Sequence, residues 1–146
     1  MNVFCKLSVL CLALCVGEPK EPKVIYTGCQ YDKSVKAYTQ VDQLPEYPGG
    51  LTGYSKFFIH NFKYPDTSII QPRINIEFVV KPNGSLSKIG IYKKRKEGYT
   101  IVDKEGIRVF KLMPRWKPGT CGGKAVPVHM VMPNIVELQS WLSVGM

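Results

Sequence analysis

Apolar and polar residues alternate along residues 73–80, which is the two-residue period of a β-strand that buries one face. The sequence Pro82-Asn83-Gly84 follows, and these residue types favour a tight turn. A second strand is predicted from about residue 86 to residue 93. The pattern therefore predicts a β-hairpin, and the apolar positions of its first strand are Ile74, Ile76, Phe78 and Val80.

Two other segments repeat their apolar residues at helical spacing. In residues 51–65 the repeat stops at Tyr64-Pro65, and its apolar positions are Leu51, Tyr54, Phe57, Phe58 and Phe62. In residues 99–114 the repeat stops at Pro114, and its apolar face holds Val102, Gly106, Phe110 and Met113, flanked by Ile107 and Val109. Each segment predicts an amphipathic helix that a proline ends.

A third alternating stretch lies at residues 124–133, where Val126, Val128, Met130 and Met132 alternate with Ala125, Pro127, His129 and Val131. The predicted order is therefore helix, strand, strand, helix, strand. A helix that returns along the sheet brings the last strand back antiparallel to the hairpin. We expect an α+β fold, with a three-stranded antiparallel sheet and two helices packed on one of its faces.

The first 17 residues contain one cation, Lys6, then an apolar run over residues 7–16, and then Gly17. The run is shorter than the roughly 20 apolar residues that a membrane-spanning helix needs, but it fits the core of a signal peptide. We expect export with cleavage after Gly17, and lipid attachment at Cys15 is the alternative. The predicted organisation is a signal peptide at 1–17, a tether and N-terminal extension at 18–40, one domain at 41–135 and a tail at 136–146.

The composition and charge narrow the class of protein. With 146 residues, of which 45% are hydrophobic, the chain has material for one domain of ordinary size. The net charge of +9 favours anionic partners without choosing among them. The strongest basic run is a candidate anionic contact or a solvated strand end, and it consists of Lys93, Lys94, Arg95 and Lys96. No row of aromatic residues for stacking bases accompanies it, so we expect no nucleic-acid partner.

Two cysteines, Cys29 and Cys121, follow the predicted leader. In an oxidising compartment they either form a disulfide or remain two thiols, and the sequence leaves both states open. The chain has no Gly-x-Ser-x-Gly, no phosphate-binding glycine loop and no cysteine pairs at metal spacing. His60 and His129 lie on different predicted elements without a patterned carboxylate beside them. We therefore expect no enzyme activity, no catalytic residue, no cofactor and no metal site.

The motifs "VDQLPEYPGG", "RINIEFVVKPNGSLSKIGIYK", "DKEGIRVFKLMPRWKPG" and "GKAVPVHMVMP" follow one another between residues 41 and 133. In this order they resemble the C-terminal domain of the TonB energy transducer, in the form common in Bacteroidetes-type bacteria. The resemblance covers about residues 41–135, and "PEYPGG" and "MPRWKPG" are its most specific stretches. It implies that Trp116 covers the core where the chain leaves the second helix, while Arg115 and Lys117 face water.

The resemblance also implies a function. Such domains lie in the periplasm and bind short segments of outer-membrane receptors, which add as an extra strand beside the last strand of the sheet. An edge strand offers unpaired N–H and C=O groups to such a guest. We therefore expect outer-membrane TonB-dependent receptors or other envelope proteins as partners, with a homodimer through edge strands as a further option. The predicted partner-strand residues are Val126, Val128, His129, Met130, Val131 and Met132.

This chain departs from the related domains in four places. A full transducer has an N-terminal membrane helix and a long proline-rich spacer, where this sequence has residues 1–17 and "EPKEPK". The segment between Tyr64-Pro65 and Arg73 is shorter, and Gly106 stands in place of a helix-favouring alanine. Pro127 interrupts the last strand and lacks an N–H, so we expect it to weaken the edge. An envelope adaptor without energy coupling is the alternative function, and a polyanion-binding protein is a more distant one.

Overall fold

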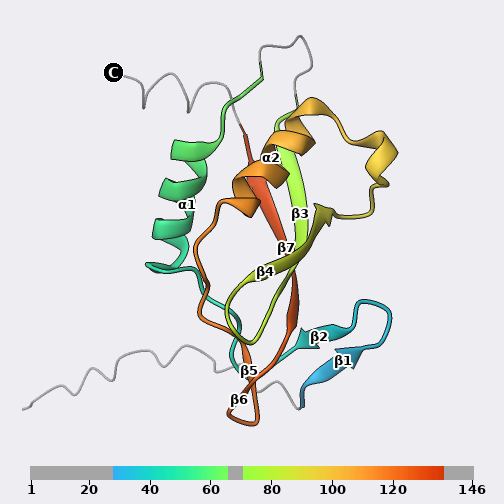
Figure 1. Ribbon diagram of the computed structural model, residues 1–146, viewed down its shortest axis with the longest axis vertical. Helices are drawn as coiled ribbons and strands as arrows, with labels where there is room; N and C mark the ends of the chain where they lie inside the picture. The colour runs from blue at the N-terminus through green and yellow to red at the C-terminus, as the bar shows by residue number, and fades with distance from the viewer. Residues whose placement is uncertain (1–27, 66–70, 137–146) are drawn as a thin grey trace, which may run out of the picture.

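The computed structural model describes residues 28–65 and 71–136, and Figure 1 shows how their elements are arranged. In chain order the elements of this part are β1 (Gln30–Asp32), β2 (Ala37–Gln40), α1 (Gly50–Asn61), β3 (Arg73–Val80), β4 (Leu86–Ile91), the 3-10 helix η1 (Lys96–Gly98), α2 (Ile101–Lys111), β5 (Thr120–Cys121), β6 (Lys124–Ala125) and β7 (Val128–Ile135). The expected signal peptide, the lipidation alternative at Cys15 and the tail beyond Val136 lie outside the described residues.

The prediction of a three-stranded antiparallel sheet was wrong. The main sheet has five strands in the order β1-β2-β7-β3-β4, and β5 and β6 form a separate two-stranded sheet. The main sheet is mixed, because β2 pairs parallel with β7 whereas the other pairs are antiparallel. The additional strands of the main sheet are three and four residues long and lack apolar alternation, so their sequence gives no periodic signal.

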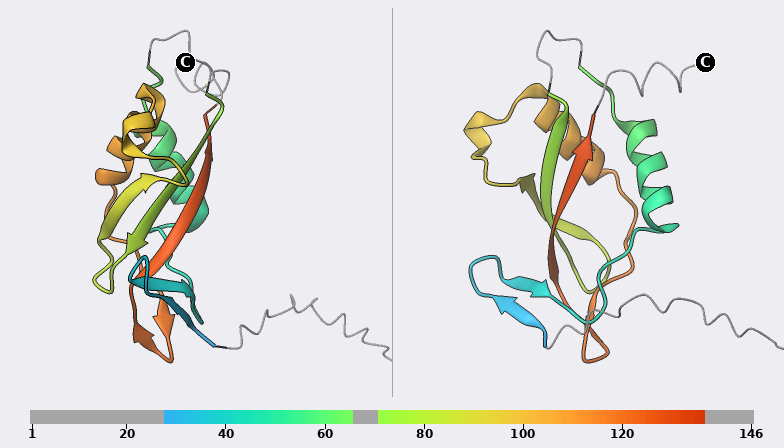
Figure 2. Two further views of the ribbon diagram at one scale, coloured as in Figure 1. Left: turned by 90° about the vertical axis from the view of Figure 1, so that its right-hand side faces the viewer. Right: turned by 180° about the vertical axis from the view of Figure 1, so that it is seen from behind.

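Both helices cover the same face of the sheet, as predicted. The side chains of Ile74, Ile76 and Phe78 on β3 point to this face and are at most 1% exposed. The Phe110 ring of α2 lies 5.1 Å from that of Phe78, and the Tyr54 ring of α1 lies 6.1 Å from that of Phe110. Figures 1 and 2 show α1 beyond β7, on the side away from β3. Both helices therefore share one core, with α1 at its margin.

Helix α1 buries a narrower stripe than its sequence predicts. Tyr54 and Phe58 are its buried residues. Leu51, which was expected on the buried face, is 72% exposed. Because α1 lies beyond β7, the sheet covers only part of the apolar face of this helix.

Trp116 is buried, with 4% of its surface exposed, while Arg115 and Lys117 beside it face solvent. Its ring packs perpendicular to that of Tyr47, with 5.5 Å between the centroids. The Trp116 backbone N–H donates to the Gly84 carbonyl at 2.9 Å. Gly84 has a φ of +81°, and a Cβ there would lie 2.1 Å from the Trp116 carbonyl oxygen. The hairpin turn therefore needs glycine both for its backbone and for its contact with Trp116.

Gly106 allows α2 to approach β3 closely. A Cβ at this position would lie 3.0 Å from Ile76 Cδ1 and 3.3 Å from Ile74 Cδ1, both closer than carbon atoms normally pack. A glycine at this position favours a helix less than alanine does, but it serves the packing of α2 on β3. In the described ranges of the chain, no helix has the length and apolar character needed to cross a membrane.

Candidate partner-binding site

Among the residues that the structure describes, one side of β7 is paired with β3, and its other side is met by β2 at a single position and is otherwise unpaired. The Tyr92 N–H donates to the Asn75 carbonyl at 2.9 Å, so Asn75 directs its peptide groups toward β4. Successive residues of a strand direct their peptide groups to opposite sides. Asn75 therefore faces Pro133 without hydrogen bonds, and Pro133 directs its own backbone outward. By this alternation the outward-directed residues of β7 are His129, Val131, Pro133 and Ile135.

Pro133 fits this arrangement. A proline lacks the backbone donor, and at this position the missing donor belongs to the outer edge and not to the ladder with β3. The edge keeps the N–H and C=O groups of Val131 and Ile135 and the carbonyl of Pro133. Within residues 28–65 and 71–136, these outward groups have no partner. They are available to another extended backbone.

Helix α1 flanks the open edge and leaves a hollow of about 370 Å³ between itself and β7. The lining residues come from the two elements alone, and they are Leu51, Tyr54, Ser55, Phe58, Ile59, Met132, Pro133, Asn134 and Ile135. Most of these side chains are apolar, and Ile135 is 63% exposed at the outer rim. We name this feature the α1–β7 groove. Apolar side chains of an added strand can enter such a groove while its backbone pairs with the edge.

A buried hydrogen bond fixes α1 against β7. The Tyr54 hydroxyl donates to Asn134 Oδ1, and Asn134 Nδ2 donates to the Met132 carbonyl at 3.1 Å. Burial raises the pKa of the Tyr54 phenol, which keeps it protonated and able to donate. Together with the packing of Tyr54 and Phe58 against Phe110, this hydrogen bond holds α1 beside the edge.

A smaller hollow of about 170 Å³ shares Leu51, Tyr54 and Met132 with the groove and extends it toward Trp116. The Trp116 Nε1 atom is buried without an acceptor in the part of the chain that the structure describes. Sequence reasoning assigned Trp116 to packing alone. The structure places it both in the core and at the inner end of the groove.

The last strand, which was predicted over residues 126–132, spans Val128–Ile135 in the structure. Its role in partner binding stays a prediction. Val126 precedes the strand, whereas His129 and Val131 lie in it and direct their backbone groups outward. The other three predicted residues turn their side chains to the helix-covered face, and they are Val128, Met130 and Met132. Pro133 and Ile135 belong to the strand in the structure but were not among the predicted residues, because the predicted strand ended at Met132.

The chain's own hairpin of β1 and β2 covers the beginning of the edge. Tyr38 lies opposite Val128, and its N–H donates to the Pro127 carbonyl at 2.8 Å. Pro127 lacks a backbone donor, but its carbonyl oxygen is the group that pairs with β2. The missing donor therefore does not prevent this pairing. The open part of the edge runs from Val131 to Ile135.

One of the four cations that were predicted as a possible anionic contact, Lys94, forms an ion pair within the protein. Lys94 Nζ lies 2.5 Å from the carboxylate of Asp103, which is 1% exposed. That carboxylate also accepts the Thr100 N–H at 2.9 Å and thereby caps α2. Burial raises the pKa of Asp103, but hydrogen bonds from Lys94, Thr100 and Gln71 outweigh this effect, so the pKa lies below its usual value. Lys94 is therefore a structural residue.

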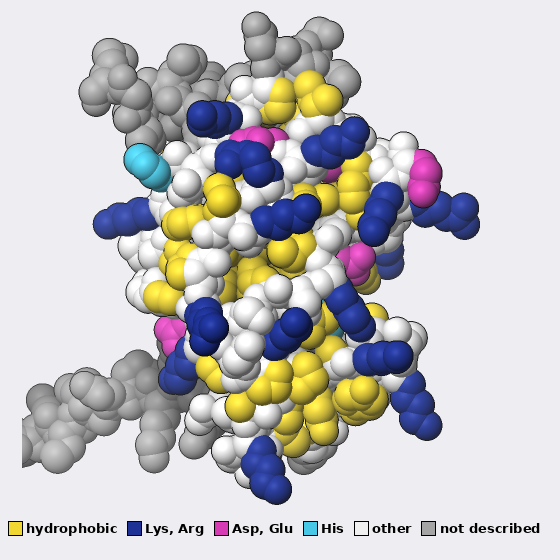
Figure 3. All heavy atoms as spheres, in the orientation of Figure 1, with side chains coloured by type: hydrophobic (Ala, Val, Ile, Leu, Met, Phe, Trp, Pro, Cys, Tyr) yellow, Lys and Arg dark blue, Asp and Glu magenta, His cyan; other side chains and the backbone are white. Residues whose placement is uncertain are grey.

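The other three cations of the basic run, Lys93, Arg95 and Lys96, are exposed. Lys93 Nζ lies 5.1 Å from the centroid of the Tyr92 ring. On the face seen in Figure 3, lysine and arginine side chains are spread over the surface and do not gather in one patch. The run has the features of a solvated strand end more than those of a focused anion site.

Cys29 and Cys121 form a disulfide bond, which is one of the two states that the sequence left open. Beside it, Asp42 Oδ2 accepts the Gly122 N–H at 2.6 Å. The two sulfur atoms and the Asp42 carboxylate lie within 4.8 Å of one another. Because the thiolate is the form of cysteine that ligates metals, the disulfide state offers no metal site here.

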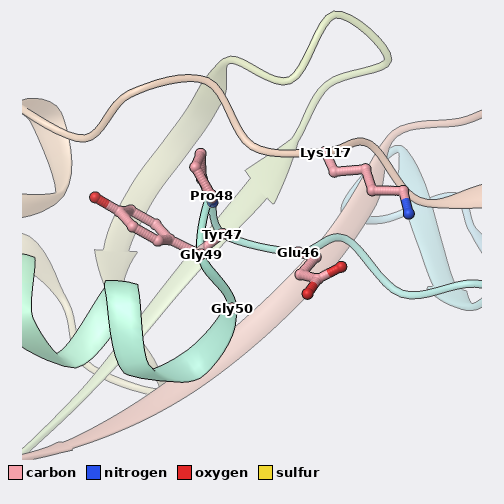
Figure 4. Close-up of a pocket in the computed structure, with 6 residues that line it drawn as sticks. All are labelled: Glu46, Tyr47, Pro48, Gly49, Gly50 and Lys117. Carbon is pink, nitrogen blue, oxygen red and sulfur yellow. The ribbon is translucent and has the colours of Figure 1, made fainter.

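Two further places bring charged or titratable side chains together. A hollow of about 500 Å³ at the start of α1 is lined by Glu46, Lys117 and the Tyr47–Gly50 turn, and Figure 4 shows Tyr47 pointing away from the two charged side chains. On the open face of the sheet, His129 Nε2 lies 3.5 Å from the Glu77 carboxylate, a neighbour that sequence reasoning missed because it comes from another strand. Ser34 and Lys88 line the same hollow as Glu77 and His129. No hydrogen bond joins Ser34 to His129 among the described residues, and we assign no reaction to either place.

No protein-family model, curated protein or solved structure matches the chain. The resemblance to the TonB C-terminal domain therefore rests on the sequence motifs. The two stretches most specific to this resemblance, "PEYPGG" and "MPRWKPG", lie side by side, because Glu46 and Lys117 exchange backbone hydrogen bonds of 3.0 and 2.8 Å.

Proposed function

We propose that this chain is an exported protein-binding domain that takes an extended partner segment onto the edge of β7 from Val131 to Ile135. The observation that carries the proposal is an unpaired backbone edge beside the apolar α1–β7 groove. A guest strand satisfies the open N–H and C=O groups, and its inward side chains fill the groove. Backbone pairing provides affinity, and the groove selects apolar side chains.

The resemblance to TonB supplies the partner class. We propose outer-membrane receptors as partners, in the periplasm, and participation in TonB-dependent transport across the outer membrane. An adaptor that binds envelope proteins at the same edge without energy coupling is the alternative. The proposal includes no reaction, cofactor or nucleic-acid partner.

Site-specific photo-crosslinking in cells tests the proposal. A photoreactive phenylalanine analogue replaces Ile135 at the rim of the groove, and the control carries it at Leu112, which is 53% exposed just beyond α2. We expect Ile135 to capture periplasmic segments of outer-membrane receptors, identified by mass spectrometry, and Leu112 to capture none of them.

Other outcomes separate the alternatives. Capture of other envelope proteins at Ile135 favours the adaptor, and capture of a second copy shows that the edge serves a homodimer. Equal capture from both positions would show that the α1–β7 groove is not the binding site.

A further inference from the structure

The hairpin of β1 and β2 covers the start of the partner edge through few noncovalent contacts. It meets β7 at one bridge, between Tyr38 and Val128. Ala37 is the buried residue of its two strands, and Tyr31 is 51% exposed. A two-stranded hairpin with so little apolar burial is marginally stable without further support.

That support is covalent on one side of the hairpin. Cys29 directly precedes β1, and its disulfide partner Cys121 ends β5. On the other side, Gln43 and Thr120 exchange backbone hydrogen bonds of 3.2 and 3.0 Å. Both ends of the hairpin are thus held at one place beside β5 and β6, as Figure 1 shows. Opening the disulfide leaves the hairpin tied at its second end and by the exposed contact of Lys88 Nζ with the Val35 carbonyl at its turn.

We propose that the Cys29–Cys121 disulfide is a latch that limits the length of the partner-binding edge. When it is reduced, β1 and β2 leave β7 and expose the backbone groups of His129 and the carbonyl of Pro127. These groups continue the row formed by Val131, Pro133 and Ile135 on the same side of the strand. The occupant is the same extended partner segment with a longer footprint, because the exposed edge is continuous with the open one. In this respect the inference rests on the proposed function.

The opening reaction is thiol–disulfide exchange with a dithiol reductant. One thiolate of the dithiol attacks Cys29 or Cys121 and releases the other cysteine as a thiolate. The second thiol of the reductant then breaks the mixed disulfide and leaves as an oxidised cyclic disulfide. Two electrons pass to the protein, and the two cysteines take up the two protons. Both cysteines are half-buried and lie beside exposed glycines, which leaves the sulfur atoms within reach.

Amide hydrogen exchange on the full chain tests the latch without any partner. The reporter is the Tyr38 amide, which bonds to Pro127, and the control is the Met130 amide, which faces β3. On reduction with dithiothreitol we expect exchange at Tyr38 to accelerate at least about tenfold while Met130 stays protected. In a Cys29→Ser, Cys121→Ser variant, Tyr38 should exchange fast with or without reductant.

Two results of this experiment would overturn the latch. Unchanged protection at Tyr38 after reduction shows that the hairpin stays on β7 without the disulfide. Loss of protection at Met130 as well shows that the disulfide stabilises the whole domain and does not act locally.

Crosslinking then tests the longer edge. A photoreactive residue at position 129 should capture the partner only in the Cys29→Ser, Cys121→Ser background, whereas one at position 135 should capture it in both backgrounds. Capture at 135 without capture at 129 in the serine background rejects the longer footprint while the proposed function stands. If the residue at position 135 captures no partner in either background, the proposed function and the longer footprint are both rejected. The exchange experiment then still decides whether the disulfide holds the hairpin on β7.

Discussion

Aromatic rings from a loop, a helix and a strand meet around Trp116, whereas the hairpin of β1 and β2 lies on the sheet with one buried alanine. The three rings nearest the indole belong to Tyr47, Tyr54 and Phe78, with centroid distances between 5.3 and 6.1 Å. The hairpin is held instead by one bridge to β7, the disulfide, the backbone bonds between Gln43 and Thr120, and the contact of Lys88 with the Val35 carbonyl. The aromatic cluster around Trp116 therefore determines whether the domain folds. The hairpin determines how much of the β7 edge is open. We therefore expect substitutions in the cluster to change the stability of the whole domain, and substitutions in the hairpin to change local protection and the exposure of the edge.

The largest effect is expected at the aromatic cluster. Trp116→Ala removes a large buried ring and should lower the free energy of unfolding by about 3–5 kcal/mol. Denaturant unfolding measures this, with exposed Lys117→Ala as the neighbouring control, which should change stability by less than about 0.5 kcal/mol. Unchanged stability together with lost partner binding would show that Trp116 is a contact residue and not a packing residue.

The next effect is expected where α2 begins. Asp103→Asn keeps the shape of the side chain but removes the charge that Lys94 and the Thr100 N–H contact. We expect a loss of about 2 kcal/mol in the free energy of unfolding, because a buried capping contact and its charge-assisted hydrogen bonds weaken together. Exposed Glu97→Gln is the matched control. A loss as small in Asp103→Asn as in this control would contradict the structural role of Lys94.

The same carboxylate predicts a pH dependence. The pKa of Asp103 is lowered in the folded protein, so its contribution to stability is complete above the unfolded value, near about 4. That contribution is lost as the pH falls from there through the folded pKa. The stability difference between wild type and Asp103→Asn should therefore be constant near neutral pH and shrink below about pH 4. Thermal unfolding at a series of pH values measures it, and a constant difference down to pH 2 argues against the shift.

A smaller change in stability is expected at the partner edge. In Val131→Pro the lost N–H faces outward, as it does at Pro133, so stability should change by no more than about 1 kcal/mol while capture of the partner at Ile135 disappears. Met132→Pro is the matched comparison, because its N–H faces β3, and it should destabilise by more than about 2 kcal/mol. Normal partner capture by folded Val131→Pro would move the binding site away from the backbone of β7.

The smallest effect on global stability is expected in the hairpin. Tyr38→Pro removes the donor to Pro127 and should lower the free energy of unfolding by about 0.5 kcal/mol or less, because the hairpin buries little. Amide protection in the rest of the hairpin should nevertheless be lost. Tyr38→Phe keeps the donor and should retain that protection. A large global loss in Tyr38→Pro would remove the distinction between the two regions.

The parts of the fold that sequence predicted are those that apolar burial determines. Ile74, Ile76 and Phe78 alternate because one face of β3 lies under both helices, and Gly84 marks the turn that follows. The pairing of β1 and β2 with the sheet was not predicted, because a disulfide, one bridge to β7 and a few isolated hydrogen bonds hold them, and none of these leaves a periodic pattern. Residue patterns report burial, and they do not report which distant segments pair.

The candidate site was predicted in part. The last strand was correctly taken as a strand with one core face, but its end was placed at Met132. Whether a proline ends a strand depends on the side to which its missing N–H would point, and at Pro133 that side is the open edge. The capping role of Asp103 had a readable signal, since Thr100 and Asp103 stand at the spacing of a capping box, whereas nothing in that spacing indicates the ion pair with Lys94.

The pairing of β7 with β3 has a consequence for how the protein is made. β3 lies between β7 and β4 in the sheet, and its partner β7 is the last element that the structure describes. The centre of the sheet therefore cannot assemble until nearly all of the described chain has been synthesised, because long-range strand pairing must wait for both strands. A polypeptide that is threaded through a channel with its N-terminus first stays open until β7 arrives. Such a folding order would suit the export that we propose for this chain.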